Sequence, residues 1–513
     1  MIAILDFGSQ YTQLIARRVR EAGVYCEILP YNVELERLTA HEPAALILSG
    51  GPASIYEEGA PHPQPGVLDL DLPMLGICYG MGVLVTAEGG KVASSGHREY
   101  GPAPLTVTAN EGLFSGFNGA KPRVWMSHGD RLESLPPGWS AVATSKNSPL
   151  AAAQRDDGRR HVVQFHPEVV HTERGSDVLS NFMFKVSGLK NDWSMESFVD
   201  ATSRRIKEQV GDGHVICGLS GGVDSTVTAA LLERAVPGQL TCVFVNNGLL
   251  RKDEADEVKG RLGDYFGADF VYVDASDRFL DALAGVEDPE KKRKIIGGTF
   301  IDVFEDAARD AESRKGPVKF LAQGTLYPDV IESVSVNGPS ATIKSHHNVG
   351  GLPERMKLEL VEPLRELFKD EVREAGRVLG VPADSLDRHP FPGPGLAVRI
   401  LGPINRDDLA VLREADAIFI EEIRAAGLYD DIWQAFAVLL PIRTVGVQGD
   451  FRTYDKVIAL RAITSEDGMT ADWFRFPPEV LAQSSARIAN EVAGVSRVAY
   501  DISSKPPATV EWE

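Results

Sequence analysis

A cysteine between two glycines is the first residue of this chain that could act as a nucleophile. Cys78 follows the apolar run 74–77 in the sequence GICYG. The glycines allow a tight strand-to-helix turn that leaves no room for larger side chains. Such a turn presents the thiol at the tip of a strand, and the amino end of the following helix favours the thiolate.

A base, and a group that orients the base, are expected further along the chain. The segment VVQFHPE is an expected strand that leads to His166 and Glu168. Side chains two residues apart in an extended segment point to the same side, so Glu168 is expected to hold the imidazole that exchanges a proton with Cys78. A tetrahedral oxyanion also needs backbone N–H donors. The candidate donors are the amides of Gly51, in SGGP, and Tyr79.

The competing interpretation of Cys78 is a buried structural thiol, the usual state of a cysteine in apolar surroundings. We favour that interpretation for Cys26, Cys217 and Cys242, which lie in apolar, strand-like runs. Cys78 differs because its expected partners also stand at strand ends, on one alternating α/β pattern. Together the three motifs predict nucleophilic catalysis.

A second candidate site is the run CGLSGGVDST at 217–226, between an expected strand and an expected helix. Its amides and hydroxyls, with a helix amino end behind them, suit phosphate oxygens. The lysine of a Walker loop is absent, and Asp224 could instead hold Mg²⁺ on the phosphates of ATP. A plain Gly-Gly turn is the less favoured alternative. The predicted ATP-binding residues are Ser220, Gly221, Gly222, Val223, Asp224, Ser225 and Thr226.

Two alternating series of apolar runs and helical patterns must position these motifs. The first series has its runs at 2–5, 25–29, 44–48 and 74–77, and the second at 214–219, 240–245, 269–274 and 319–323. Each series is typical of a parallel sheet covered by helices. After residue 388 a Pro- and Gly-rich stretch leads to an expected helix at 406–426 and strand-like runs at 438–447 and 456–463. We therefore predict an α/β fold, with parallel-sheet domains at 1–190 and 191–388 and a small α+β domain at 389–513.

Length and composition exclude several classes of protein. A chain of 513 residues is too long for one hydrophobic core. The net charge of −20 disfavours a nucleic-acid partner, because phosphate backbones are bound by clustered Lys and Arg. No apolar stretch predicts a membrane span, and the first residues do not look like a signal peptide. Four cysteines do not predict a disulfide framework. We expect a cytoplasmic enzyme.

The motifs resemble known families. SGGP, GICYG and HPE resemble the class I glutamine amidotransferases over about residues 1–190, and SHGD at 127–130 is similar to the segment that lines their glutamine pocket. SGGVDST resembles the N-type ATP pyrophosphatases, which have an adenine-nucleotide α-hydrolase-like fold. Longer blocks, among them EKKRKIIGGTF at 290–300 and SKPPATVEWE at 504–513, are similar to the glutamine-hydrolysing GMP synthases.

The resemblance implies a two-site reaction. Cys78 forms a γ-glutamyl thioester and releases ammonia, while ATP adenylates xanthosine 5′-monophosphate (XMP), and ammonia then displaces AMP to give GMP. The resemblance also implies a homodimer formed through the C-terminal domain. By position it assigns XMP binding to Arg293, Gln434, Asp450, Lys505 and Glu511. His346 and His347 are interpreted as ATP-site or structural residues, and residues 285–300 as a lid with hinge freedom at Gly297 and Gly298.

Two positions depart from the family pattern, and three alternatives stay open. Gly82 stands where the family usually has the Gln of C-x-G-x-Q, which helps hold the substrate, and Asn246 stands where Asp is common. The chain could be a glutamine-dependent ATP pyrophosphatase amidotransferase with another acceptor, as in NAD synthetase. It could carry a glutaminase-like domain that only regulates, or it could use free ammonia alone.

Overall fold

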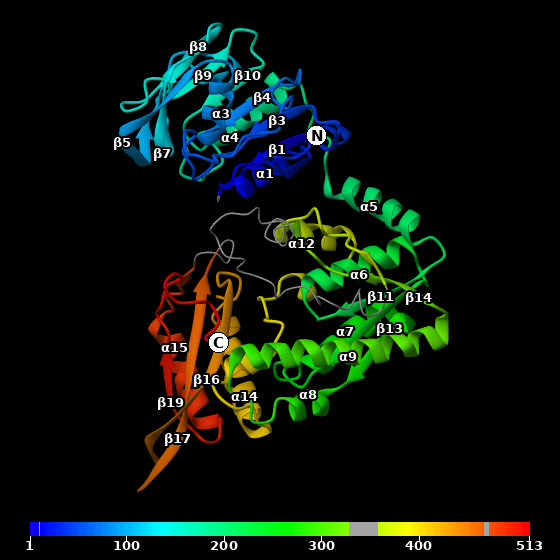
Figure 1. Cartoon of the computed structure of the whole chain (residues 1–513). Coiled ribbons are helices and arrows are strands. Elements are labelled where there is room, and N and C mark those ends of the chain that lie inside the picture. Colours follow the sequence, from blue (N-terminus) through cyan, green and yellow to red (C-terminus); the bar gives the residue numbers. More distant parts are fainter. Residues whose placement is uncertain (10, 328–357, 449, 466–470) are drawn as a thin grey trace. The chain divides into compact units, whose positions relative to one another are not determined.

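The computed structural model describes residues 1–9, 11–327, 358–448, 450–465 and 471–513, and of residues 94–98, 268 and 448 it describes the backbone alone. The chain divides into two compact units, Met1–Phe198 and Val199–Glu513. Both combine sheets with covering helices (Figure 1). No described helix has the length and apolar character needed to cross a membrane.

The first unit is built on an eight-stranded sheet in the order β2-β1-β3-β4-β10-β9-β8-β6. The pairs from β2 to β10 are parallel, and those from β10 to β6 are antiparallel. A ribbon of β5 and β7 lies apart from this sheet. The strands are β1 (Ile2–Asp6), β2 (Cys26–Pro30), β3 (Ala45–Leu48), β4 (Met74–Ile77), β5 (Lys91–Pro104), β6 (Thr106–Val107), β7 (Arg123–Ser134), β8 (Trp139–Thr144), β9 (Ala152–Arg155) and β10 (Arg160–Val163).

Helices cover this sheet and join its strands. Strands β3 and β4 are buried along their whole length, which is why their sequences, ALIL and MLGI, are continuously apolar. The helical segments are α1 (Thr12–Glu21), α2 (Leu35–Ala40), α3 (Tyr79–Ala87), η1 (Gly112–Phe114), α4 (Gly175–Ser180) and the π-helical η2 (Asn181–Val186). Helix α5 (Met195–Val210) spans the boundary between the units.

The second unit contains a five-stranded parallel sheet in the order β13-β12-β11-β14-β15. Its strands are β11 (His214–Leu219), β12 (Leu240–Asn246), β13 (Phe270–Asp274), β14 (Val318–Ala322) and β15 (Glu359–Val361). The helical segments around it are α6 (Val223–Ala235), α7 (Glu254–Phe266), η3 (Gly267–Asp269), α8 (Ser276–Ala282), α9 (Pro289–Lys315), α12 (Lys369–Val378), α13 (Ala383–Leu386) and η4 (Gly395–Arg399).

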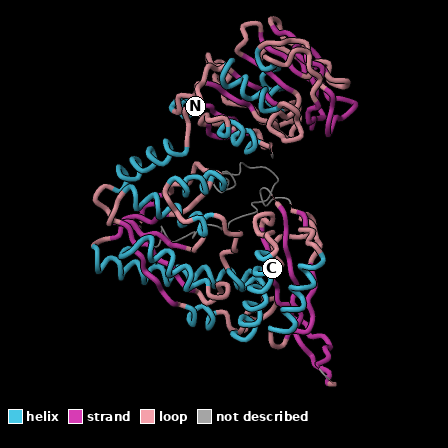
Figure 2. Tube along the Cα trace, turned by 180° about the vertical axis from the view of Figure 1, so that it is seen from behind, coloured by secondary structure: helices cyan, strands magenta, loops and turns pink. Residues whose placement is uncertain are grey.

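The end of the chain adds a mixed sheet to the second unit. One long antiparallel hairpin, β16 (Gln434–Gln448) and β17 (Phe451–Thr464), pairs with β18 (Asp472–Trp473) and, in parallel, with β19 (Val495–Tyr500). Helices α14 (Arg406–Ala425) and α15 (Pro478–Glu491) complete this part (Figure 2). Its core is continuous with that of the parallel sheet, since residues from Ile216 to Val495 share one hydrophobic cluster. The fold is therefore α/β in both units with an α+β end, as the sequence predicts.

Candidate active sites

Backbone geometry at the end of β4 holds Cys78 in a strained turn. Cys78 has φ 52° and ψ −103°, between β4 and the first residue of α3. A Cβ at Gly80 would lie 2.3 Å from the carbonyl oxygen of Leu48, and one at Gly76 would lie 2.6 Å from that of Gly80. Only glycine fits at either position. A non-glycine residue at positive φ costs on the order of 1–3 kcal/mol and is typical of a residue that the fold holds for function.

His166 and Glu168 lie together beside Cys78, but β10 ends at Val163, and a turn at Pro167 and Glu168, not strand alternation, brings the two side chains together. The imidazole Nδ1 lies 2.7 Å from Oε1 of Glu168, and both side chains are almost completely buried. The Thr172 hydroxyl donates to the carbonyl of His166 at 2.6 Å. The Tyr11 ring packs edge-on against the imidazole with centroids 5.0 Å apart. These contacts fix the orientation of the His166 imidazole ring.

The electrostatics favour a protonated ring. Burial disfavours the charged form, but the Glu168 carboxylate and the Cys78 sulfur outweigh it and raise the pKa of His166 to about 10. At neutral pH the ring is therefore an imidazolium beside the cysteine. A protonated imidazole hydrogen-bonded to a cysteine is the state that stabilises a thiolate and can donate a proton to a leaving group.

The two predicted oxyanion donors lie next to each other. A Cβ at Gly51 would lie 3.3 Å from Cγ of Tyr79 and 2.8 Å from the carbonyl oxygen of Phe7, so glycine is required for this approach. Tyr79 is the first residue of α3, where the backbone N–H has no acceptor within the helix. Both positions can therefore offer backbone donors beside Cys78.

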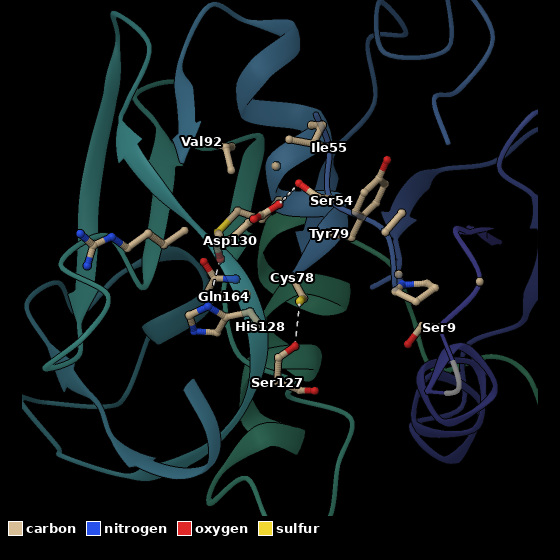
Figure 3. A pocket seen from close by; sticks show the side chains of 18 of the residues that line it. Ser9, Ser54, Ile55, Cys78, Tyr79, Val92, Ser127, His128, Asp130 and Gln164 are labelled. Atoms are coloured by element: carbon tan, nitrogen blue, oxygen red, sulfur yellow. Dashed lines mark hydrogen bonds between the residues drawn. The ribbon is translucent and has the colours of Figure 1, made fainter. Parts of the chain in front are cut away.

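Cys78 opens into a cavity of about 980 Å³ (Figure 3). The Sγ atom lies 3.6 Å from the carbonyl oxygen of Ser127, which places the SHGD segment in the cavity wall. Asp130, in the same segment, accepts from the Ser54 hydroxyl at 2.6 Å. Gln164 also lines the cavity and is buried. The sequence analysis did not single out Gln164, which lies directly after β10 and two residues before His166.

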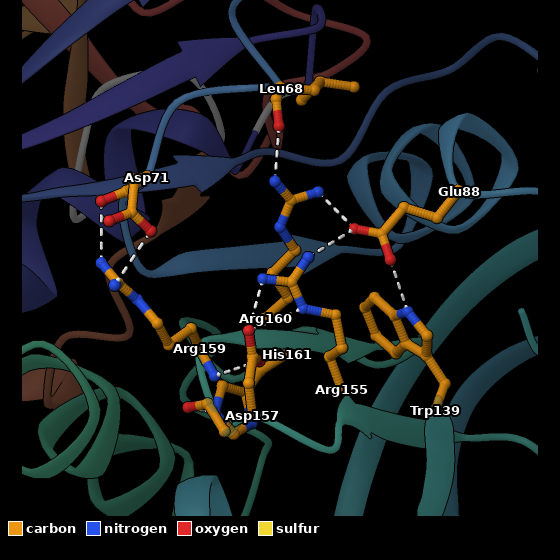
Figure 4. A network of polar contacts seen from close by, with 10 residues as sticks. Leu68, Asp71, Glu88, Trp139, Arg155, Asp157, Arg159, Arg160 and His161 are labelled. Carbon is orange, nitrogen blue, oxygen red and sulfur yellow. Dashed lines mark hydrogen bonds and ion pairs between the residues drawn. The ribbon is translucent and has the colours of Figure 1, made fainter. Parts of the chain in front are cut away.

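An ionic cluster lies at the carboxyl end of α3, the helix that follows Cys78 (Figure 4). Glu88, which caps α3, accepts from Trp139 Nε1 at 2.6 Å and from Arg155 at 3.2 Å, and pairs with Arg160. Arg160 begins β10, the strand that leads to His166, and also donates to the carbonyl of Leu68 at 2.6 Å. The cluster thus ties α3, the helix that follows Cys78, to β10, the strand that precedes His166.

The glycine-rich loop joins β11 to α6 in the second unit. Gly221 has φ 76°, a conformation that larger residues rarely adopt. The Ser225 hydroxyl accepts from the amide of Ser220 at 3.1 Å, and the Ser220 hydroxyl accepts from the amide of Gly222 at 3.3 Å. The hydroxyl of Thr226 donates to the carbonyl of Gly222 at 2.8 Å. The loop is thereby preformed at the amino end of α6.

Asp224 has a partner that the sequence analysis missed. The ammonium of Lys369, the first residue of α12, lies 2.7 and 2.6 Å from the two carboxylate oxygens. Among the described residues no three His, Cys, Asp or Glu side chains are grouped to hold a metal ion. Mg²⁺ usually takes one or two carboxylates and completes its ligands with phosphates and water, so Asp224 fits a Mg²⁺ that binds together with ATP.

Comparisons with known proteins agree along the whole chain. The model of the class I glutamine amidotransferases matches residues 3–186, and the model of the GMP synthase C-terminal domain matches residues 421–512. Proteins named glutamine-hydrolysing GMP synthase, from Bartonella henselae and Phenylobacterium zucineum, are 56% and 57% identical, over 100% of this chain and 98% of each relative. A relative of the same name from Agrobacterium fabrum is 57% identical over the same shares. The chain belongs to the glutamine-hydrolysing GMP synthase family.

Three of the residues predicted to bind XMP lie near the C-terminal segment of the second unit. The Glu511 carboxylate accepts from Arg399 at 2.9 and 3.1 Å and from Gln434 at 2.9 Å. Arg293 donates to the carbonyl of Glu513 at 2.6 Å. Arg461, which is fully buried, donates to carbonyl oxygens near the end of the chain and holds the C-terminal segment in place. Glu511 is thus ordered although it lies near the chain end.

Two other residues of the predicted GMP synthase substrate site lie elsewhere. The backbone of Lys505 pairs with Ala471. Asp450 lies at the tip of the β16–β17 hairpin, which projects from the rest of the unit (Figure 1). A rise of about 3.4 Å per strand residue puts that tip on the order of 45 Å from Gln434. A single chain therefore does not bring Asp450 to Glu511.

Three further expectations from the sequence concern the second unit of this chain. His346 and His347 lie outside the described residues. Gly297 and Gly298 lie inside the continuous helix α9, so they provide no hinge, and Lys292 in its second turn is fully buried and bonded to the carbonyls of Ala397 and Ile400. Asn246 donates to the Tyr272 hydroxyl at 3.1 Å and accepts from the amide of Gly248 at 3.0 Å. Asn246 thus shapes the turn after β12.

Proposed function

We propose that this chain makes GMP from XMP, with the first unit releasing ammonia from glutamine and the second unit using ATP to prepare XMP for amination. The observation that carries the proposal is the contact of His166 with Glu168 at 2.7 Å beside Cys78, in a cavity large enough for glutamine. Full-length similarity to proteins named glutamine-hydrolysing GMP synthase supports the choice of product.

In the first reaction the Cys78 thiolate attacks the side-chain amide carbon of glutamine. The new C–S bond pushes electrons onto the oxygen, which the amides of Gly51 and Tyr79 stabilise. The His166 imidazolium protonates the amide nitrogen, the C–N bond breaks, and ammonia leaves. The neutral ring then takes a proton from water, which attacks the thioester, and glutamate leaves as the thiolate re-forms. Glu168 positions the ring and stabilises its charged form.

In the second reaction the loop 220–226 binds the phosphates of ATP. Asp224 would hold a Mg²⁺ together with the phosphates, and the ion would supply neutralisation of phosphate charge there. Lys369 can exchange its contact with Asp224 for a phosphate oxygen, because both are anionic partners for its ammonium. The C2 oxygen of XMP attacks the α-phosphorus and pyrophosphate leaves. Ammonia then attacks C2, and AMP carries away the oxygen.

The proposed XMP contacts are supported by the resemblance to the family and by charge. Arg293 and Lys505 are cations suited to the nucleotide phosphate. Glu511 and Gln434, joined at 2.9 Å, can instead contact N–H and hydroxyl groups. Asp450 belongs to the same predicted set and would have to act from a second copy of the chain.

A homodimer formed through the C-terminal hairpin is part of the proposal. Large apolar side chains on its two strands are exposed, among them Val447 at 74%, Phe451 at 79% and Tyr454 at 61%. Exposed apolar side chains grouped on one element are typical of an interface. A cytoplasmic location is also proposed, since the described cysteines are free thiols.

The decisive experiment measures GMP formation from XMP, ATP and Mg²⁺, with glutamine or ammonium as nitrogen donor. Cys78→Ala should lose the glutamine-driven reaction and keep the ammonium-driven one. If the parent forms no GMP from either donor, the acceptor is wrong, and other acceptors for a glutamine-dependent ATP pyrophosphatase must be tried. Equal rates of both proteins with glutamine would contradict the role of Cys78.

A further inference from the structure

A buried carboxamide in the wall of the glutamine cavity has no role in the proposed glutaminase steps. Gln164 lines the cavity together with Cys78 and His166, and it is 2% exposed (Figure 3). Its Oε1 atom is buried and has no hydrogen-bond partner among the described residues. A buried acceptor without a donor is costly, so an acceptor of this kind in a cavity wall indicates a ligand that supplies the donor.

Sheet register places Gln164 beside the reacting cysteine. Val163, the last residue of β10, pairs with Ile77, the last residue of β4, and its carbonyl accepts from the amide of Cys78 at 2.8 Å. The next residues along the two strands are Gln164 and Cys78, and neighbouring strands lie about 4.8 Å apart. The amide of Gln164 donates to the carbonyl of Ala151 at 2.8 Å, which fixes the backbone that carries the carboxamide.

The predicted oxyanion donor Gly51 lies on the other side of Cys78. In the sheet, β4 stands between β3 and β10. Gly51 follows β3, whereas Gln164 follows β10, so the two residues reach the reacting carbon from opposite sides of β4. The carbonyl oxygen of a bound glutamine would turn toward Gly51, and it carries no hydrogen that Oε1 of Gln164 could accept.

Only one group at the reacting carbon has a hydrogen that suits Oε1 of Gln164. The carbon is bonded to an oxygen, a nitrogen and a methylene group, and of these the amide nitrogen alone has polar hydrogens. It is also the atom that His166, which follows the same strand as Gln164, must protonate. The α-ammonium of glutamine is four covalent bonds away, about 5 Å, and the carboxylates of Glu57 and Asp130 in the same cavity suit its charge.

We propose that Gln164 is a specificity-determining residue of the glutaminase reaction, whose Oε1 accepts a hydrogen bond from the side-chain N–H of glutamine and turns the leaving nitrogen toward His166. This inference rests on the proposed glutaminase reaction and deepens it. The bonds that form and break are unchanged, and ammonia leaves with the hydrogen that Oε1 accepts. A substrate with an ester oxygen in place of the nitrogen has no such hydrogen and gains nothing from Gln164.

The test compares L-glutamine with L-glutamate γ-methyl ester, which forms the same thioester on Cys78 and releases methanol instead of ammonia. The assay is glutamate formation by the full-length chain, with the rate of Cys78→Ala subtracted as background. The readout is the ratio of kcat/KM for glutamine to that for the ester. Gln164→Met keeps the length of the side chain and removes the acceptor, so it should lower this ratio by roughly fivefold to a hundredfold, the effect of leaving one polar group without its partner.

Two variants serve as controls. Gln164→Glu keeps an acceptor oxygen in place and should retain a ratio close to that of the parent. Gln154→Met makes the same substitution on β9, where Oε1 of Gln154 is also buried without a partner among the described residues but does not line the cavity, and it should leave the ratio unchanged. Circular dichroism verifies that each variant is folded. Gln164→Ala, which only removes atoms, gives the same test if methionine does not fit.

The outcomes separate this inference from the function on which it rests. Equal losses for glutamine and for the ester in Gln164→Met and Gln164→Ala would overturn it, because Gln164 would then support the site without contacting the leaving nitrogen. A ratio as low in Gln164→Glu as in Gln164→Met would also overturn it, since an acceptor at this position would not matter. Failure of the parent to form glutamate from either compound would instead remove the proposed glutaminase function.

Discussion

The most specific prediction about the first site concerns the effect of the Glu168 charge on the pKa of His166. Glu168→Gln keeps the size of the side chain and its ability to accept from Nδ1 of His166, now 2.7 Å away, but removes the negative charge. Loss of an opposite charge at this distance lowers the pKa of a cationic group by about 1–3 units. The pKa of His166, about 10 in the parent, should fall by that amount.

The consequence appears on the alkaline side of the pH profile. A protonated His166 is needed to protonate the leaving nitrogen, so glutamine hydrolysis should stay level from pH 7 to 9 and decline as the pH rises through about 10. If Glu168→Gln lowers the pKa by about 2 units, its activity at pH 9 should be roughly a tenth of its activity at pH 7. The raised pKa also stabilises the folded parent below the unfolded value of about 6.5, and this stabilisation is lost as the pH rises through about 10.

The assay is ammonia release from glutamine between pH 6 and 10.5, with ammonium-driven GMP formation as a measure of folding. Glu173→Gln is the matched control, because Glu173 lies nearby in sequence but pairs at the surface with Arg123 at 2.9 Å. Its alkaline limb should coincide with that of the parent. If Glu168→Gln also coincides with the parent, the carboxylate does not raise the pKa of His166, and the assigned proton transfer is refuted.

Three further predictions concern other parts of the chain. Gly80→Ala should lower the free energy of unfolding by at least about 1–3 kcal/mol in urea denaturation, because its Cβ would lie 2.3 Å from the Leu48 carbonyl oxygen; an unchanged midpoint would show that the turn adjusts freely. Lys369→Met should lower ammonium-driven GMP formation by roughly a hundredfold, since no cation would replace the ammonium near Asp224, and a parental rate would place the ATP phosphates elsewhere. Phe451→Asp should convert a dimer to a monomer in sedimentation velocity, and a monomeric parent would contradict the proposed interface.

Local chemistry made much of the first site predictable. The glycines around Cys78 indicate a turn that excludes side chains, and the structure contains that turn with φ 52°. The predicted contact of His166 with Glu168 is present at 2.7 Å, although a turn after β10, and not strand alternation, forms it. Both features involve residues only a few positions apart, whose types and spacing a sequence displays directly.

The limits of sequence-based prediction are clear in the C-terminal part. Strand-like runs at 438–447 and 456–463 predict two short strands, whereas β16 and β17 extend over Gln434–Gln448 and Phe451–Thr464 as one hairpin. Cross-strand pairing, and not local propensity, decides where a strand ends. The antiparallel strands β8 and β9, which extend the first sheet beyond β10, were not predicted for the same reason.

The sequence by itself determined the kinds of chemistry available: a cysteine in a glycine turn, a histidine with a carboxylate two residues later, and a glycine-rich loop before a helix. These features are local, and their geometry follows from sterics and short-range hydrogen bonds. Only the tertiary structure decided that Lys369 meets Asp224, 145 residues away, and that Ile55 and Val92 face the side of α3 left bare by Gly82. Such pairings depend on how distant elements pack, which the spacing of residues along one chain does not specify.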